Sequence, residues 1–167
     1  MESRYKLLGH PIHAILIPYP LALLSTAAVF DVVGLLIGDG TWHAAAYLMI
    51  AAGVLVGLAA GLFGALDWLG VPRETRARSV GFSHGSGNVV VLVIFIVSWL
   101  LRTGRVEDPG LVPVALAVVG AGILGVTGWL GGELPYRLRI GIDEGAHPDA
   151  PSSLSGEPIV RAEPRGS

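Results

Sequence analysis

Two histidines, His10 and His13, lie at the start of a run from Leu7 to Phe30 that contains no Asp, Glu, Lys or Arg. An imidazole is costly to leave unpaired near lipid, and a neutral ring nitrogen binds metal ions and haem iron. The three-residue spacing places both rings on one face of a helix. We therefore interpret the pair as part of a ligand-binding site whose other members come from neighbouring helices.

The composition is typical of a membrane protein. Hydrophobic residues make up 52% of the 167 residues and charged residues 14%, with a mean hydropathy of +0.65. Soluble domains carry about 25% charged residues. The net charge of -2 gives no basis for a nucleic-acid partner. The absence of Cys excludes thiolate catalysis, disulfides and cysteine-bound iron–sulfur clusters within this chain.

Four runs free of charged residues are each long enough to cross a bilayer, whose hydrocarbon core of about 30 Å needs about 20 helical residues. Short polar or charged segments separate them, which favours antiparallel neighbours. We predict an all-α fold: an integral membrane four-helix antiparallel bundle over residues 1–142, with spans at about 11–36, 42–68, 81–101 and 111–131. The first run contains Pro18 and Pro20 and has no convincing cleavage site, so we expect it to be retained rather than removed as a signal peptide.

Basic residues predict the orientation. With an even number of spans, both termini share one side of the membrane with the loop between the second and third spans. That side has seven basic residues close to the spans (Arg4, Lys6, Arg73, Arg76, Arg78, Arg137 and Arg139), against Arg102 and Arg105 on the other. The positive-inside rule predicts a multi-pass protein of the bacterial plasma (inner) membrane with both termini in the cytoplasm.

Two further predictions concern packing and the tail. Glycines at regular spacing on the second span (Gly53, Gly57, Gly61) and on the fourth (Gly122, Gly125, Gly128) predict close helix packing. Proline, serine, glycine and acidic residues predict a disordered cytoplasmic tail over residues 143–167. No internal repeat is evident in the sequence.

The predicted topology brings polar residues from all four helices to the cytoplasmic face. The candidate cofactor ligands are His13, His84 and His10, and a metal ion would draw on His10, His13, His84, Asp67 and Glu133. Imidazole nitrogen and carboxylate oxygen together suit zinc or non-haem iron. Asp67 and Glu133 also have a plainer interpretation as ion-pair partners of nearby arginines. At the opposite face we interpret His43 as an interface residue and Asp31 as a mark of the membrane edge.

Several motifs together resemble a bacterial membrane family catalogued as domain of unknown function 2231. They are Gly9-His10-Pro11-x-His13, Phe63-Gly64-x-x-Asp67-Trp68, the loop from Pro72 to Arg78 with His84, and Gly131-Gly132-Glu133-Leu134-x-Tyr136-Arg137. The resemblance covers about residues 7–142 and implies a four-helix membrane protein. Ala14 stands where many members have proline, which leaves the candidate ligands intact. Some relatives are joined to a Rieske-type iron–sulfur module, which implies electron transfer and a redox partner protein.

Three functions stay open at this stage. The first is electron transfer through haem b or a divalent metal ion bound at the cytoplasmic-face site. The second is proton-coupled transport of a small molecule, with the proline-broken first helix as the moving element. The third is a structural membrane subunit without a cofactor. No nucleophile, base and orienting group occur together in the sequence, which disfavours hydrolytic catalysis. Whether the chain is an enzyme stays open, although an enzyme acting on its own is the less expected case. A homo-oligomer is compatible with the sequence.

Overall fold

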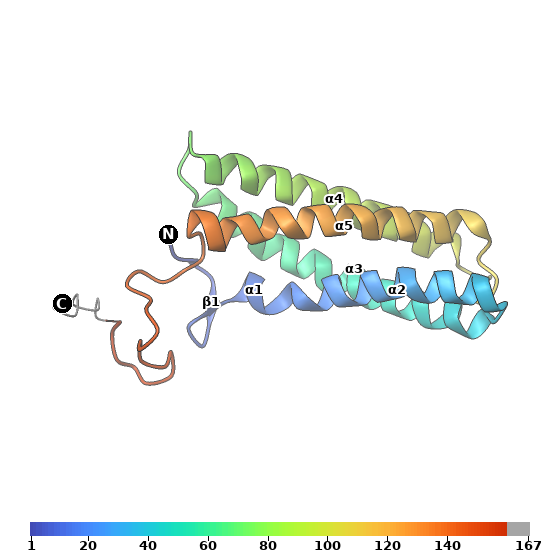
Figure 1. Cartoon of the computed structure of the whole chain (residues 1–167), viewed down its shortest axis with the longest axis horizontal. Helices are drawn as coiled ribbons and strands as arrows, with labels where there is room; N and C mark the ends of the chain where they lie inside the picture. Colours follow the sequence, from blue (N-terminus) through green and yellow to red (C-terminus); the bar gives the residue numbers. More distant parts are fainter. Residues whose placement is uncertain (160–167) are drawn as a thin grey trace.

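Four long antiparallel helical segments make up the body of the protein (Figure 1). The computed structural model describes residues 1–159. Its helices are α1 (Ile12–Leu16), α2 (Pro18–Ile37), α3 (Gly40–Leu69), α4 (Arg76–Leu101) and α5 (Leu111–Leu138). Ile12–Ile37, Gly40–Leu69, Arg76–Leu101 and Leu111–Leu138 are each long and apolar enough to cross a membrane. The predicted all-helical, four-span fold class is confirmed.

The two ends of the bundle differ. At one, here called the near end, lie the N-terminal segment, the α3–α4 loop and the chain after α5 (Figure 1). A short antiparallel hairpin of β1 (Lys6–Leu7) and β2 (His10–Pro11) precedes α1 there. Within the predicted tail, residues 143–159 form turns and irregular chain, and residues 160–167 lie outside the described part. At the other end, the far end, lie the α2–α3 and α4–α5 loops.

Local sequence explains where the helices start and stop. The Asp39 side chain accepts a hydrogen bond from the backbone N–H of Thr41 and so caps α3. Thr75 caps α4 in the same way, through the N–H of Arg78. These side-chain oxygens satisfy backbone donors that the first helical turn leaves free. Gly38 ends α2 in the left-handed conformation, with φ of 70°.

The first span is broken into two helices. Pro18 and Pro20 have no backbone N–H to donate, so the regular hydrogen-bond pattern is interrupted beside Ile17. Helix α1 therefore has only five residues, none of them buried, whereas α4 runs unbroken for 26 residues. This break follows one turn after His13, as the sequence indicated.

Small residues bring the helices together, although not all of those expected. A Cβ added at Gly53 would lie 2.7 Å from Leu24, and one at Gly57 would lie 2.8 Å from Leu92. The other four predicted glycines (Gly61, Gly122, Gly125 and Gly128) would meet nothing within 4 Å. The packing interpretation of the α5 stripe is therefore wrong within this chain. That helix packs instead through Gly120 and Gly131, which lie about three turns apart on one face and both contact α4.

The two halves of the bundle repeat one arrangement. Leu24 of α2 packs on Gly53 of α3, and Phe95 of α4 packs on Gly120 of α5. Both pairs obey constant offsets, since 71 residues separate Leu24 from Phe95 and 67 separate Gly53 from Gly120. Helices α2 and α4 run parallel and lie diagonally opposite, as do α3 and α5 (Figure 1). An approximate two-fold axis therefore runs along the bundle, as in membrane proteins with parallel repeats.

Candidate functional site

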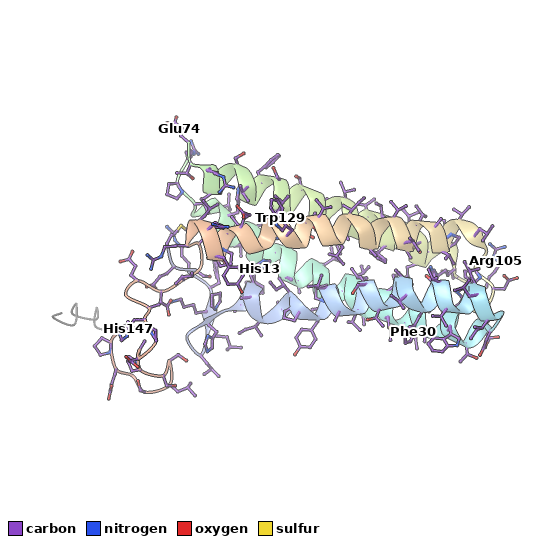
Figure 2. All side chains as sticks on the ribbon, in the orientation of Figure 1. His13, Phe30, Glu74, Arg105, Trp129 and His147 are labelled. Atoms are coloured by element: carbon purple, nitrogen blue, oxygen red, sulfur yellow. The ribbon has the colours of Figure 1, made fainter. Side chains whose placement is uncertain are left out.

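His13 and His84 face each other across the inside of the bundle. Their ring centres lie 6.5 Å apart, and the ring planes make an angle of 84°. Figure 2 shows the His13 side chain directed inward from α1. His84 lies eight residues after the first residue of α4, which places it about 12 Å along that helix. The contact between His13 and His84 was predicted from the sequence. It lies deeper in the bundle than the ends of the helices.

Both rings are held in the same way. Nδ1 of His13 lies 2.8 Å from the carbonyl oxygen of Ala60, and Nδ1 of His84 lies 2.8 Å from that of Thr127. A carbonyl oxygen only accepts hydrogen bonds, so each Nδ1 carries the proton and donates it. In a neutral imidazole, Nε2 then keeps its lone pair. Histidines that bind metals through Nε2 are commonly held by this kind of Nδ1–H contact.

Each histidine also packs on a glycine of the neighbouring helix. A Cβ at Gly64 would lie 2.8 Å from Cε1 of His13, and a Cβ at Gly131 would lie 2.8 Å from Cε1 of His84. Each glycine comes four residues after the carbonyl that accepts the Nδ1–H bond. The offsets are again 71 for the histidines and 67 for the glycines. His13 and His84 are therefore equivalent residues of the two halves, and they meet close to the two-fold axis.

Small residues follow each histidine and each carbonyl partner in the sequence. Gly61 of α3 and Gly85 of α4 would each accept a Cβ with nothing within 4 Å, and so would Gly128 of α5. Ala14 of α1 holds the position equivalent to Gly85 and is exposed. These four residues, each next in the chain to a histidine of the pair or to the residue whose carbonyl binds it, are exposed.

The surroundings of the two rings differ in one respect. The hydroxyl of Thr127 donates to Oδ1 of Asn88 at 3.0 Å, and the Asn88 amide donates to the His84 carbonyl at 2.9 Å. That amide nitrogen is 3.3 Å from Nδ1 and 3.2 Å from Nε2 of His84. Because it is nearly equidistant from both, it faces the ring instead of bonding to one nitrogen. The equivalents of Asn88 and Thr127 in the first half are Ile17 and Ala60, which offer no such side chains.

The structure does not bring the other predicted ligands to this pair. His10 is exposed on β2. Asp67 accepts a hydrogen bond from Ser3 at 2.7 Å, and Glu133 pairs with Arg76 at 2.8 Å, which fits the plainer interpretation of Glu133. Within residues 1–159, no three His, Asp or Glu side chains are grouped in a way that would hold a metal ion. The expected five-residue site reduces to the two histidines because the carboxylates lie closer to the helix ends.

A second polar cluster at the far end was missed by the sequence interpretation. Arg102 and Asp31 form a two-pronged ion pair, with Nη1–Oδ1 and Nη2–Oδ2 distances of 2.7 and 2.6 Å. Both side chains are 0% exposed. Nδ1 of His43 lies 2.9 Å from Asp31 Oδ1, and that histidine is buried too. Asp31 therefore does not simply mark the membrane edge, and His43 is not an open interface residue.

This far-end cluster joins all four spans. Ser98 of α4 donates to the carbonyl of Pro113 on α5 at 2.7 Å, and Arg102 reaches the same carbonyl at 3.1 Å. Asp31 and Arg102 are 71 residues apart, so they too are equivalent residues that meet near the two-fold axis. Both stand 18 residues after the histidine of their half. This shared spacing of 18 residues was the feature of the sequence from which the far-end cluster could have been predicted.

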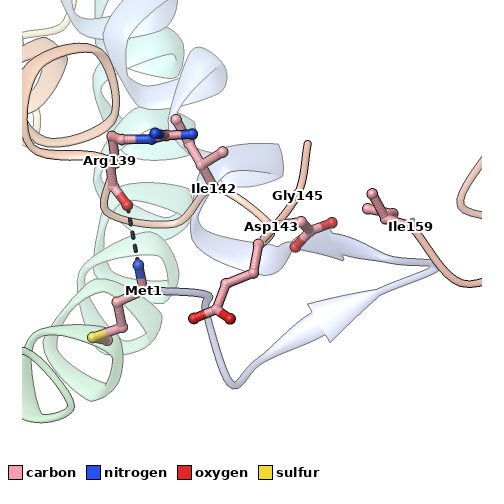
Figure 3. A pocket seen from close by; sticks show the side chains of 7 residues that line it. Met1, Arg139, Ile142, Asp143, Gly145 and Ile159 are labelled. Atoms are coloured by element: carbon pink, nitrogen blue, oxygen red, sulfur yellow. Dashed lines mark hydrogen bonds between the residues drawn. The ribbon is translucent and has the colours of Figure 1, made fainter. Parts of the chain in front are cut away.

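A shallow hollow at the near end carries a third group of polar residues (Figure 3). Its volume is about 590 Å³, and its walls are Met1, Arg139, residues 142–145 and Ile159. The Met1 amino group donates to the Arg139 carbonyl at 3.2 Å. A hydrogen bond to Asp143 raises the pKa of Lys6, and the Glu144 N–H lowers the pKa of Glu2. These contacts dock the N-terminal segment on the chain after α5 and do not reach the histidines.

The sequence was also compared with known proteins. Over residues 9–144 it matches the family described as "Predicted membrane protein (DUF2231)", which confirms the resemblance found in the motifs. Neither a curated protein nor a solved structure matches the chain.

Proposed function

Because the chain belongs to the DUF2231 family of predicted membrane proteins, whose description names no activity, we propose a function from the site itself. The protein binds one haem b between His13 and His84 and passes electrons at the membrane. The observation that carries this proposal is the facing pair, each with Nδ1 on a backbone carbonyl and therefore with its lone pair on Nε2.

The spacing of the pair suits one metal ion between two rings. An imidazole nitrogen binds a transition metal at about 2 Å, which places the centres of two opposed rings roughly 6 Å apart. The observed separation is 6.5 Å. The separation of the rings is therefore compatible with both histidines holding one iron ion.

The number of protein ligands favours haem over a bare ion. If haem were bound, His13 and His84 would hold its iron, and the group would supply a one-electron redox centre. A divalent ion held by protein alone prefers three or four protein ligands. Only two histidines meet here, since Asp67 and Glu133 have other partners. These facts support haem b as the cofactor.

Haem binding is tested by expressing the full chain with ample haem and purifying it in mild detergent. We expect a Soret band and, after reduction, the sharp visible bands of iron with two histidine ligands. His84→Ala should lower the haem retained at least about 10-fold, because it removes a ligand. His13→Ala should abolish the six-coordinate spectrum.

His10→Ala is the matched control, because His10 is exposed and only three residues from His13. It should leave the spectrum unchanged. A wild-type protein that retains no haem would contradict the proposal and leave the histidines as hydrogen-bonded links between helices. Stoichiometric metal without a Soret band would replace haem with a metal ion.

A further inference from the structure

We propose that the hairpin of β1 and β2 inserts its turn, residues 7–9, into the membrane surface at the near end and so anchors α1 there. The partner is the lipid bilayer that the chain crosses, at the boundary between headgroups and acyl chains. Three features support this anchor: the conformation of the turn, the apolar side chains around it, and the weak attachment of α1 to the bundle. The hairpin surface does not include the histidine pair, and anchoring requires no haem.

The turn holds a leucine in a conformation that leucine disfavours. Leu7 pairs with His10, which leaves Leu8 and Gly9 as a two-residue turn with φ angles of 51° and 85°. Positive φ at both positions is typical of hairpin turns made by Asn-Gly, because asparagine and glycine enter the left-handed region more easily than other residues. Leu8 therefore raises the energy of the turn. Its side chain is 69% exposed, so packing against the protein offsets little of this cost.

Further apolar side chains surround the turn. Leu7 is exposed on β1, and so is Tyr5 just before that strand. The chain after α5 adds the exposed Leu154, whose neighbour Ser153 packs on the turn, since a Cβ added to Gly9 would lie 2.5 Å from the Ser153 Cβ. Exposed apolar side chains grouped in this way mark membrane or protein contacts. Tyrosine is enriched at the level of the lipid headgroups.

The position of the hairpin favours lipid as the partner. Strand β2 ends at Pro11, directly before Ile12, the first residue of the first span. Three residues separate Gly9 from Ile12, at most about 10 Å of extended chain, so the turn lies at the level of the headgroups. Figure 1 shows the turn to the side of α1, pointing away from the bundle. The exposed side chains of Ile17 and Leu21 continue the apolar surface along the first span.

An anchor at this position supplies what α1 lacks. Helix α1 has five residues, none of them buried, and no side chain caps its start. The break beside Ile17 separates it from α2. The hairpin is joined directly to α1, because the Ile12 N–H donates to the Tyr5 carbonyl at 2.9 Å. Contact of the turn with lipid therefore fixes the position of α1 in the membrane.

The depth of the turn is measured with single cysteines, because the chain has none of its own. Leu8→Cys and, as the matched control, Glu74→Cys each carry an environment-sensitive fluorophore on the full chain in phosphatidylcholine nanodiscs. Glu74 is exposed at the same end (Figure 2) and has a φ of 64°, so it shares the backbone conformation of Leu8. We expect a nitroxide on a shallow acyl carbon to quench the Leu8 probe several-fold more strongly than the Glu74 probe, and iodide in the water to do the reverse.

The variant Leu8→Asn separates anchoring from the stability of the turn itself. Asparagine suits the left-handed conformation, so a turn that faces water should become more stable in this variant. If the turn lies in lipid, loss of the leucine should instead speed amide hydrogen exchange of residues 6–16 in nanodiscs at least about 5-fold, because apolar burial is lost. Exchange is followed by mass spectrometry. Glu74→Asn should leave the exchange of these residues unchanged.

Three results would overturn the membrane anchor. The first is a Leu8 probe that iodide quenches as strongly as the Glu74 probe while the lipid nitroxide has no effect. The second is a Leu8 probe that neither quencher reaches, which would place the turn against protein. The third is equal or slower hydrogen exchange in Leu8→Asn, as expected of a turn that faces water. Since neither measurement uses haem, the outcome is independent of the proposed haem site.

Discussion

At the scale of single residues, a glycine determines how closely each histidine approaches the neighbouring helix. Gly64 and Gly131 come one helical turn after the carbonyl that accepts the Nδ1–H bond. A side chain there would press on Cε1 of the ring, between its two nitrogens. The same residue that permits the hydrogen bond thus also fixes the position of the ring.

Gly131→Ala should destabilise the protein and weaken the histidine site. The added Cβ would lie 2.8 Å from His84 Cε1, so the ring must move. Overpacking of this kind costs about 1–3 kcal/mol of unfolding free energy. Gly122→Ala is the matched control on the same helix, where a Cβ meets nothing within 4 Å. Because alanine favours helix over glycine, the control should be neutral or stabilising by up to about 1 kcal/mol.

Both variants are compared by thermal unfolding in detergent without cofactor, and then by haem retention. A lower melting temperature for Gly131→Ala alone is the expected result. Equal melting temperatures and equal haem retention would show that the close contact of Gly131 with His84 contributes neither to stability nor to haem binding.

Sequence reasoning located the histidine pair but not the residues that hold it. His13 and His84 were predicted to meet because the topology places them at one depth, and topology follows from hydropathy. The Nδ1 contacts were not predictable, since a backbone carbonyl accepts equally well at any position. Asp31 was taken to mark the membrane edge and its pairing with Arg102 was missed, because each stands at the end of an apolar run, where exposed and buried charges look alike in sequence. Each of these charged side chains can be buried because it pairs with the other, and the two residues are 71 positions apart in the sequence.

At the scale of helices, the Asp31–Arg102 pair is the strongest polar link between the two halves. It joins α2 to α4 across the bundle, with His43 and the Pro113 carbonyl completing it from α3 and α5. Both side chains are fully buried, so bulk solvent does not screen the pair. Helices within a half pack more extensively than helices of different halves, so this link matters most for their relative position.

Arg102→Met should destabilise the bundle strongly. It leaves the Asp31 carboxylate buried with only His43 as a partner, and breaking a buried ion pair costs about 3–5 kcal/mol. Arg105→Met removes an exposed arginine three residues along the same loop and should change the unfolding free energy by at most about 0.5 kcal/mol. The double variant Asp31→Leu/Arg102→Met removes both charges and should recover part of the loss.

These free energies are measured by unfolding in mixed detergent micelles of increasing denaturing strength. If Arg102→Met unfolded at the same point as Arg105→Met, the far-end cluster would have no role in stability. If the double variant were less stable than Arg102→Met, the charges would act independently instead of as a pair.

At the scale of the whole molecule, the approximate two-fold axis explains why polar groups occur inside an otherwise apolar bundle. Equivalent residues of the two halves come close together only near the axis. The histidine pair and the Asp31–Arg102 pair are both of this kind, 18 residues apart along each half. The sequence hides the repeat because few equivalent residues are identical and the offset changes from 71 to 67 between the helices. The repeat remains visible at glycine and histidine positions because these residues make the equivalent contacts between helices.

The orientation of the bundle decides on which side of the membrane the histidine pair lies. The histidines are nearer to the near end, where seven basic residues close to the spans predict the cytoplasm. Since the chain has no cysteine, single cysteines report the side directly. We expect Thr103→Cys, in the far-end loop, to react with a membrane-impermeant maleimide in intact cells, and Ser155→Cys to react only after the membrane is permeabilised. The reverse pattern, or equal labelling of both, would contradict this orientation. With the near end in the cytoplasm, the proposed haem site would lie toward the cytoplasmic side, since 18 residues, about 27 Å of helix, separate each histidine from the Asp31–Arg102 pair.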